Sequence, residues 1–176
     1  MPFEPYIVTA ELPGEILAWA DGLRRAHFPP ERNQLAAHVT LFHALAPSLL
    51  PEIERLLAAL AGQHPPPHAR ITGLMNLGRG TALAIASPAM LALREAVANH
   101  FHGALTAQDN HPPRLHITIQ NKVTPAAARA LQMEPGRDFA MRDFAFTGFG
   151  LHIYKGGPWQ PVDRWSFRGK SGKNSG

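Results

Sequence analysis

Two tetrapeptides in this chain share one pattern, in which a histidine and a threonine alternate with apolar residues. The first spans residues 38–41 (His-Val-Thr-Leu) and the second spans residues 116–119 (His-Ile-Thr-Ile). Histidine can take up or give a proton near neutral pH, and a threonine hydroxyl can donate a hydrogen bond to a growing negative charge. Such a set suits phosphoryl chemistry, in which one group activates the attacking oxygen and another protonates the leaving oxygen.

Each tetrapeptide predicts part of a β-strand, along which side chains alternate between two faces. A histidine and a threonine two residues apart are then separated by about 6.6 Å, so both can contact neighbouring atoms of one substrate. The same residues also fit a structural role, in which each histidine bonds a local main-chain carbonyl. In the first strand we expect His38, Thr40 and Phe42 to share one face, with His43 on the opposite face. In the second strand the expected shared face carries His116, Thr118, Gln120 and Lys122.

The tetrapeptides fall at matching points of a repeated pattern. Strand, helix, motif strand and helix follow one another in each half of the chain, so we expect a duplicated β-α-β-α unit. The expected helix caps are Ser48, Ser87 and Thr124, two of them followed by proline at the first helical position. Expected strands lie at residues 5–12, 37–45, 69–77, 81–86, 114–123, 139–154 (as one strand or two) and 159–167.

These motifs resemble those of the 2H phosphoesterase superfamily, which includes 2′-5′ RNA ligase-like proteins and RNA 2′,3′-cyclic phosphodiesterases. The resemblance covers about residues 5–167. It implies an α+β, bilobal fold with pseudo-twofold symmetry around a central cleft. It also implies metal-independent chemistry on 2′,3′-cyclic or 2′-5′ phosphodiester bonds of RNA ends or nucleotides, with ligation as the reverse reaction.

The resemblance assigns roles to both motifs. His38 and His116 would be the catalytic acid–base pair, with His38 as proton donor and His116 as acceptor. Thr40 and Thr118 would bind the phosphate. The chain departs from the family pattern beside the second motif, with Leu115 where many members have proline and Gln-Asn-Lys at 120–122 where an arginine is frequent. The exact substrate, RNA or a small nucleotide, therefore stays open.

The domain organisation follows from the same pattern. We expect one bilobal domain over residues 1–170, with its lobes joined near the proline-rich run 64–68 and its C-terminal strands completing the sheets. We expect residues 171–176 to form a disordered tail. A bilobal chain of this kind can be complete as a monomer.

Composition limits the chemistry. The chain has 176 residues, 45% of them hydrophobic, and no cysteine, which excludes disulfides, thiolate nucleophiles and cysteine-bound zinc. No apolar stretch predicts a transmembrane span or a signal peptide, so we expect a cytoplasmic protein. The net charge of +4 favours anionic partners, and no cofactor is expected.

Three further residues are candidates for substrate contact: Lys122, Gln120 and Tyr154. Tyr154 and Trp159 flank a Gly-Gly-Pro loop, and an aromatic ring there could stack on a base. Two rival functions remain at this stage. One is a non-catalytic RNA- or nucleotide-binding module that keeps the cleft; the other is a metallohydrolase, although a zinc site needs three or four converging ligands.

Overall fold

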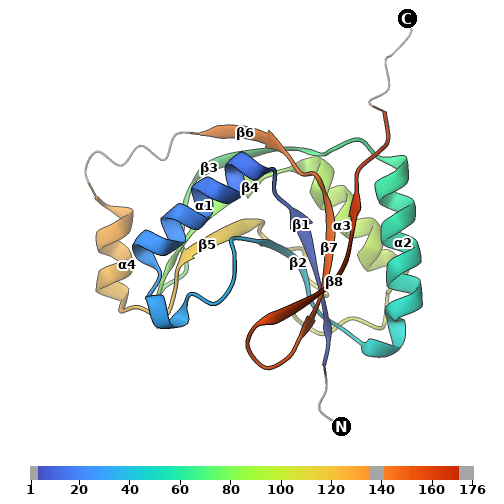
Figure 1. The fold of residues 1–176 in the computed structure, drawn as a ribbon, viewed down its shortest axis with the longest axis horizontal. Helices are drawn as coiled ribbons and strands as arrows, with labels where there is room; N and C mark the ends of the chain where they lie inside the picture. The colour runs from blue at the N-terminus through green and yellow to red at the C-terminus, as the bar shows by residue number, and fades with distance from the viewer. Residues whose placement is uncertain (1–3, 135–140, 171–176) are drawn as a thin grey trace, which may run out of the picture.

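Two four-stranded antiparallel sheets and four α-helices make up the part of the chain that the computed structural model describes, residues 4–134 and 141–170. The sheets curve toward each other like the two sides of an arch (Figure 1). The predicted α+β class with duplicated halves is confirmed. The predicted tail at 171–176 lies outside the described residues.

The first sheet has the strand order β2-β1-β7-β8. Its central strand β1 pairs with β2, which carries the first motif, and with β7, which comes from the far end of the sequence. The strand bounds are β1 (Tyr6–Glu11), β2 (Val39–Leu45), β7 (Gly148–Tyr154) and β8 (Trp159–Ser166).

The second sheet has the corresponding order β5-β4-β3-β6. The second motif lies on its edge strand β5, so both motif strands are edge strands of their sheets. The strand bounds are β3 (His68–Asn76), β4 (Thr81–Ala86), β5 (His116–Gln120) and β6 (Arg142–Ala145). The stretch 139–154, expected as one strand or two, forms two strands that belong to different sheets; residues 139 and 140 lie outside the described part.

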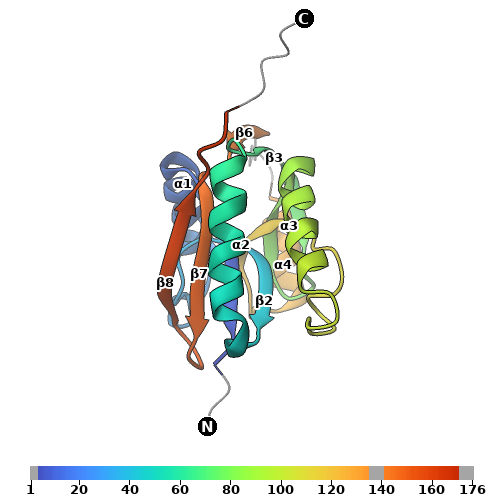
Figure 2. The ribbon, with the colours of Figure 1, turned by 90° about the vertical axis from the view of Figure 1, so that its right-hand side faces the viewer.

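Four helices cover the sheets, and two short 3₁₀ helices, Pro30–Arg32 and Pro47–Leu49, precede β2 and α2. Helix α1 contacts β5 of the opposite half, α2 covers β7 and β8, and α3 and α4 contact β3. Figure 2 shows α2 and α3 side by side on one flank. The bounds are α1 (Gly14–His27), α2 (Leu50–Gln63), α3 (Pro88–His100) and α4 (Pro125–Gln132).

The helix starts test the predicted caps. Ser87 Oγ accepts a hydrogen bond from Met90 N at 3.3 Å, and Thr124 Oγ1 accepts one from Ala127 N at 3.1 Å, so these two caps are confirmed. Ser48 is wrong as a cap, because a 3₁₀ turn occupies its position and α2 begins at Leu50 without a side-chain cap bond.

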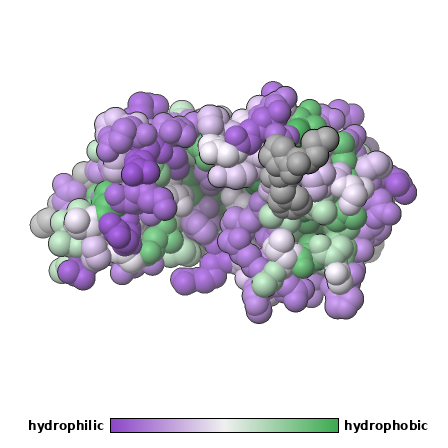
Figure 3. All heavy atoms as spheres, turned by 90° about the horizontal axis from the view of Figure 1, so that it is seen from below, coloured by the Kyte–Doolittle hydropathy of each residue, from purple (hydrophilic) through white to green (hydrophobic). Residues whose placement is uncertain are grey.

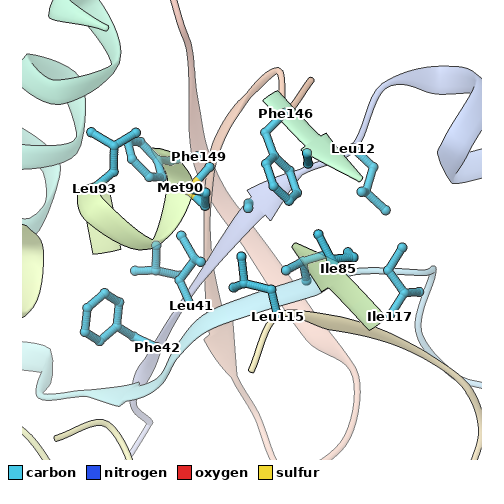
Figure 4. Close-up of a cluster of buried hydrophobic side chains, with 14 of the residues drawn as sticks. Leu12, Leu41, Phe42, Ile85, Met90, Leu93, Leu115, Ile117, Phe146 and Phe149 are labelled. Carbon is cyan, nitrogen blue, oxygen red and sulfur yellow. The ribbon is translucent and has the colours of Figure 1, made fainter. Parts of the chain in front are cut away.

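One hydrophobic core joins the two sheets. Figure 4 shows Leu41 from β2, Ile117 from β5 and Phe149 from β7 converging with side chains of α3, among them Met90. Each of these four side chains is 0–1% exposed. Burial of such a side chain stabilises the folded state by about 1.5–3 kcal/mol, so the apolar residues of the two motifs hold the strands while the histidines and threonines stay partly exposed.

Candidate active site

The two motifs meet at the hollow between the lobes. His38 directly precedes β2, and His116 is the first residue of β5. Both edge strands lie on the inner side of the arch (Figure 1), and residues of both motifs line pockets there. Seen from below, the surface is hollowed between the two halves of the molecule, and hydrophilic side chains gather there (Figure 3). Thr40 of the first motif and His116 of the second line the same pocket, so the two motifs border a common space.

The two histidines are held in the same way. Nδ1 of His38 lies 2.7 Å from the carbonyl oxygen of Ala36, and Nδ1 of His116 lies 2.6 Å from that of Arg114. A carbonyl oxygen can only accept, so each Nδ1 carries a proton and each Nε2 is the nitrogen left for substrate. The local-carbonyl bond expected for a structural histidine is therefore present, but it occupies only one of the two ring nitrogens.

His38 has a more enclosed environment. Its ring contacts Trp159 at a centroid distance of 4.6 Å. The pKa of His38 is lowered to about 4, mainly by burial and also by the electrostatic effects of Arg24, His152 and His116, against the opposing effect of the Ala36 carbonyl. His38 is therefore neutral at pH 7 in the unliganded protein.

The two threonines lie two residues beyond their histidines on half-exposed positions of β2 and β5. Thr40 pairs with Thr9 of β1, and Thr118 pairs with Ala82 of β4. Their hydroxyls make no hydrogen bond to any residue that the structure describes, and neither residue is fully buried. Both hydroxyls are thus available to a ligand.

A β-bulge follows the threonine in each motif strand. In β2, Thr40 pairs with Thr9 and Phe42 pairs with Val8, so β2 advances two residues where β1 advances one. In β5, Thr118 pairs with Ala82 and Gln120 pairs with Thr81, which is the same irregularity. The extra residue moves the side chains that directly follow it to the other face. β2 has a second irregularity farther on, between its pairs with Val8 and Tyr6.

The bulges overturn the expected faces beyond each threonine. Phe42 is buried in the core and His43 is exposed on the hollow side, the reverse of the prediction. Gln120, predicted to share the open face, is only 6% exposed, and its Oε1 accepts a hydrogen bond from Thr81 Oγ1 at 3.0 Å. Its predicted place on that face is wrong.

The other two candidates are exposed. Lys122 lies beyond the end of β5 in a left-handed turn, with φ of 61°, so it is not on the strand face. Tyr154 ends β7, and its cross-strand partner Trp159, not Tyr154, contacts His38. Substrate contact by Lys122 or Tyr154 stays a prediction.

Two buried arginines connect each half to the motif strand of the other. Arg24 of α1 donates from Nη1 to the carbonyl oxygen of Thr118 at 2.7 Å. Arg94 of α3 donates from Nε to the carbonyl oxygen of Leu41 at 3.2 Å. Each is 4% exposed, and burial lowers the pKa of each guanidinium. The sequence analysis missed both, although a charge on the apolar face of a helix, in line with Ile16 and Ala20 for Arg24, was a signal.

Two more residues near the motifs were missed. Asp109 is 1% exposed and accepts hydrogen bonds from the backbone N–H groups of His43 and Ala44 at 2.8 and 2.9 Å. Burial raises the pKa of Asp109, but these bonds and the His43 ring outweigh it and hold it below its ordinary value. His152 of β7 lies 3.2 Å from Thr9 Oγ1 through its Nε2 and also borders Trp159. Neither residue belongs to a recognisable motif.

Two pockets flank the histidine pair. A pocket of about 300 Å³ lies beside His38, and one of about 330 Å³ lies beside Thr40 and His116. Across the described residues, no group of three histidine, aspartate or glutamate side chains is arranged to hold a metal ion.

Comparison with known families decides what this arrangement is. A profile described as the 2′-5′ RNA ligase superfamily matches residues 12–158, which include both motifs. The chain belongs to this superfamily. Its members are generally phosphoesterases or ligases, and the expected 2H phosphoesterase relationship is confirmed.

Several solved structures have the same fold. TT0787 of Thermus thermophilus superposes with a TM-score of 0.68 at 19% identity, covering 95% of this chain and 100% of that one. Escherichia coli LigT complexed with 3′-AMP gives 0.62 at 19% identity, covering 94% and 99%, and LigT complexed with NADP⁺ gives 0.58 at 23%, covering 95% and 99%. No curated protein matches the sequence. Within the described residues, no helix is long and apolar enough to cross a bilayer.

Proposed function

We propose that this member of the superfamily is a metal-independent phosphodiesterase acting on 2′,3′-cyclic or 2′-5′ phosphodiester bonds of RNA ends or nucleotides. One observation carries the proposal: two histidines with identical Nδ1-to-carbonyl bonds, each followed by a threonine with a free hydroxyl, flank one hollow. The nucleotides named in the LigT complexes, 3′-AMP and NADP⁺, support a nucleotide as substrate.

The proton roles follow from the unequal surroundings of the two rings. A general base must be neutral before reaction, and the low pKa of His38 keeps it neutral at pH 7. We therefore assign His38 as the base that activates the attacking water and His116 as the acid that protonates the leaving ribose oxygen. This reverses the assignment that the family resemblance implies. In ligation the same groups would exchange roles.

The threonines would stabilise the phosphate. As the phosphorus becomes five-coordinate, negative charge grows on its non-bridging oxygens, and the hydroxyls of Thr40 and Thr118 would donate to them. Arg24, bonded behind Thr118, contributes positive charge near the same place. None of these steps requires a metal ion, a second protein or a membrane, and we propose that the protein works as a cytoplasmic monomer.

The direct test is hydrolysis of 2′,3′-cyclic mononucleotides and of a short RNA with a cyclic phosphate end, measured in EDTA. We expect turnover by the wild type and a rate lower by about 10²-fold or more in the His38→Ala/His116→Ala double variant. His102→Ala, at an exposed position after α3, is the matched control and should retain full activity. Activity abolished by EDTA would identify a metallohydrolase instead.

A non-catalytic binding module is the alternative. It would bind the same ligands through the same hollow but would show no turnover. In that case His38→Ala would weaken nucleotide binding, and neither the wild type nor the variant would show a reaction rate. Absence of turnover on every cyclic and 2′-5′ substrate, together with measurable nucleotide binding, would establish this alternative.

A further inference from the structure

The pocket beside His38 has the features of a site for a planar, hydrogen-bonding group. One side is formed by Trp159, which contacts both His38 and His152 at centroid distances of 4.6 and 5.5 Å. The remaining walls combine apolar side chains with polar ones, among them Glu11 and Gln34. At about 300 Å³ the pocket lies at the lower end of the range for small-ligand sites.

Gly150 of β7 lies under three polar side chains that line this pocket. A Cβ atom built there would collide with Glu11 Oε1 and Thr9 Oγ1 and would come within 3.0 Å of His152 Nε2. The three side chains therefore converge over one glycine, which leaves them room because it has no side chain. Thr9 and His152 satisfy each other through their 3.2 Å contact.

The carboxylate of Glu11 is different from its neighbours. It is half-buried, yet no hydrogen bond or ion pair joins it to any residue that the structure describes. Burial raises the pKa of Glu11, with Arg164 acting weakly in the opposite direction. Its oxygens reach solvent, because no fully buried side-chain oxygen of the described residues lacks a partner. A ligand that brings N–H groups can therefore replace this water and donate to a carboxylate in a partly desolvated place.

The other pocket, on the far side of the histidine pair, has the opposite character. It is lined by Arg114, His43 and His111 next to Thr40 and His116, and its one carboxylate, that of Asp109, is bonded to His43. Basic side chains of this kind suit a second phosphate rather than a base. The cleft therefore offers an aromatic, carboxylate-bearing pocket on one side of the scissile phosphate and a basic pocket on the other.

We propose that the pocket beside His38 is a nucleobase subsite in which Trp159 contacts the base and Glu11 selects guanine. The proposal rests on the proposed nucleotide substrate. Guanine presents two adjacent N–H groups, N1–H and the N2 amino group, which a carboxylate accepts as a bidentate pair. Adenine and cytosine offer only an amino group next to a ring acceptor, and the N3–H of uracil lies between two carbonyl oxygens that a carboxylate repels.

The test compares bases in both binding and turnover. Calorimetry at pH 7 would measure 3′-GMP, 3′-UMP and inorganic phosphate, and kinetics would compare guanosine with uridine 2′,3′-cyclic phosphate. We expect a preference for guanine of about ten-fold or more, the range of one bidentate base contact. Glu11→Gln should remove most of it while leaving phosphate binding and uridine turnover unchanged; Glu15→Gln, exposed on α1, is the control.

The outcomes separate this inference from the proposed function. Guanine-selective binding that Glu11→Gln abolishes would support the subsite even if no substrate turned over. Turnover without base preference, or a preference that survives in Glu11→Gln, would overturn the subsite and leave the phosphodiesterase standing. Equal loss of guanosine and uridine turnover in Glu11→Gln would also overturn it, because a specificity residue should not affect both.

Discussion

The two halves of the molecule carry the same motif on the same scaffold but give its histidine different surroundings. Both histidines donate from Nδ1 to the carbonyl two residues earlier, and both motif strands bulge after the threonine. The difference comes from the strands that complete each sheet. The β7–β8 hairpin brings Trp159 and His152 against His38, whereas the second sheet ends in the four-residue β6. Duplication provides matching geometry, and unequal additions give the two histidines the different surroundings on which their proposed acid and base roles rest.

The strongest test of this comparison is removal of each histidine. His38→Ala and His116→Ala should each lower kcat by about 10²-fold or more, because each removes one proton-transfer step. The double variant should lose little beyond the worse single variant, since the two groups act as one unit. Initial rates on a 2′,3′-cyclic nucleotide at pH 7 measure this. If the loss in the double variant equals the product of the losses in the two single variants, the histidines act independently.

The crossed arginines provide the next test. Arg24→Met and Arg94→Met each leave a main-chain carbonyl of the opposite motif strand without its donor, at a cost of about 2 kcal/mol in the free energy of unfolding. Urea denaturation measures this, with Arg25→Met, exposed on α1, as the control.

The same pair should differ in its effect on the pH profile. The charge of Arg24 lowers the pKa of His38, whereas Arg94 does not contribute to this lowering. Arg24→Met should therefore move the acid limb of kcat/KM to higher pH, whereas Arg94→Met should leave it in place. Equal shifts in both variants would contradict the electrostatic difference between the halves.

Trp159 is expected to maintain the neutral state of His38. Trp159→Leu admits water to the ring, so the pKa of His38 should rise from about 4 toward 6.5. A base must be unprotonated, so the ratio of the activity at pH 5 to the activity at pH 8 should fall. An NMR titration would follow both histidines, with Tyr154→Leu on the neighbouring strand as control. An unchanged His38 titration would refute the role given to Trp159.

Helix caps should give the smallest effects. Ser87→Ala and Thr124→Ala should each destabilise the protein by about 1 kcal/mol, because each removes an observed cap bond. Ser87 should cost more, since its hydroxyl also donates to the carbonyl oxygen of His68 at 2.6 Å. Ser48→Ala should be neutral. A loss at Ser48 in thermal or urea denaturation would mean that its side chain has a partner.

The sequence predicted what depends on local pattern. The strand periods, the repeat and the caps at Ser87 and Thr124 follow from neighbouring residues, and so does the pairing of each histidine with its threonine. The bulge in β5 was not predictable, because Ile119-Gln120 continues the alternation of apolar and polar residues. The apolar pair Leu41-Phe42 breaks that alternation and was a signal for the bulge in β2. The partners of Arg24 and Trp159 depend on contacts between distant segments, which no local period encodes.

The placement of β7 has a consequence for synthesis on the ribosome. Gly150 and His152 pair with Thr9 and Ile7 of β1, which are made long before them. Until β7 emerges, that edge of β1 has no partner, and the His152 wall of the His38 pocket does not exist. The second motif, at residues 116–118, is translated before that wall. A nascent chain therefore carries both motifs before it can assemble the His38 pocket, and the full site forms only when the two ends of the described chain meet.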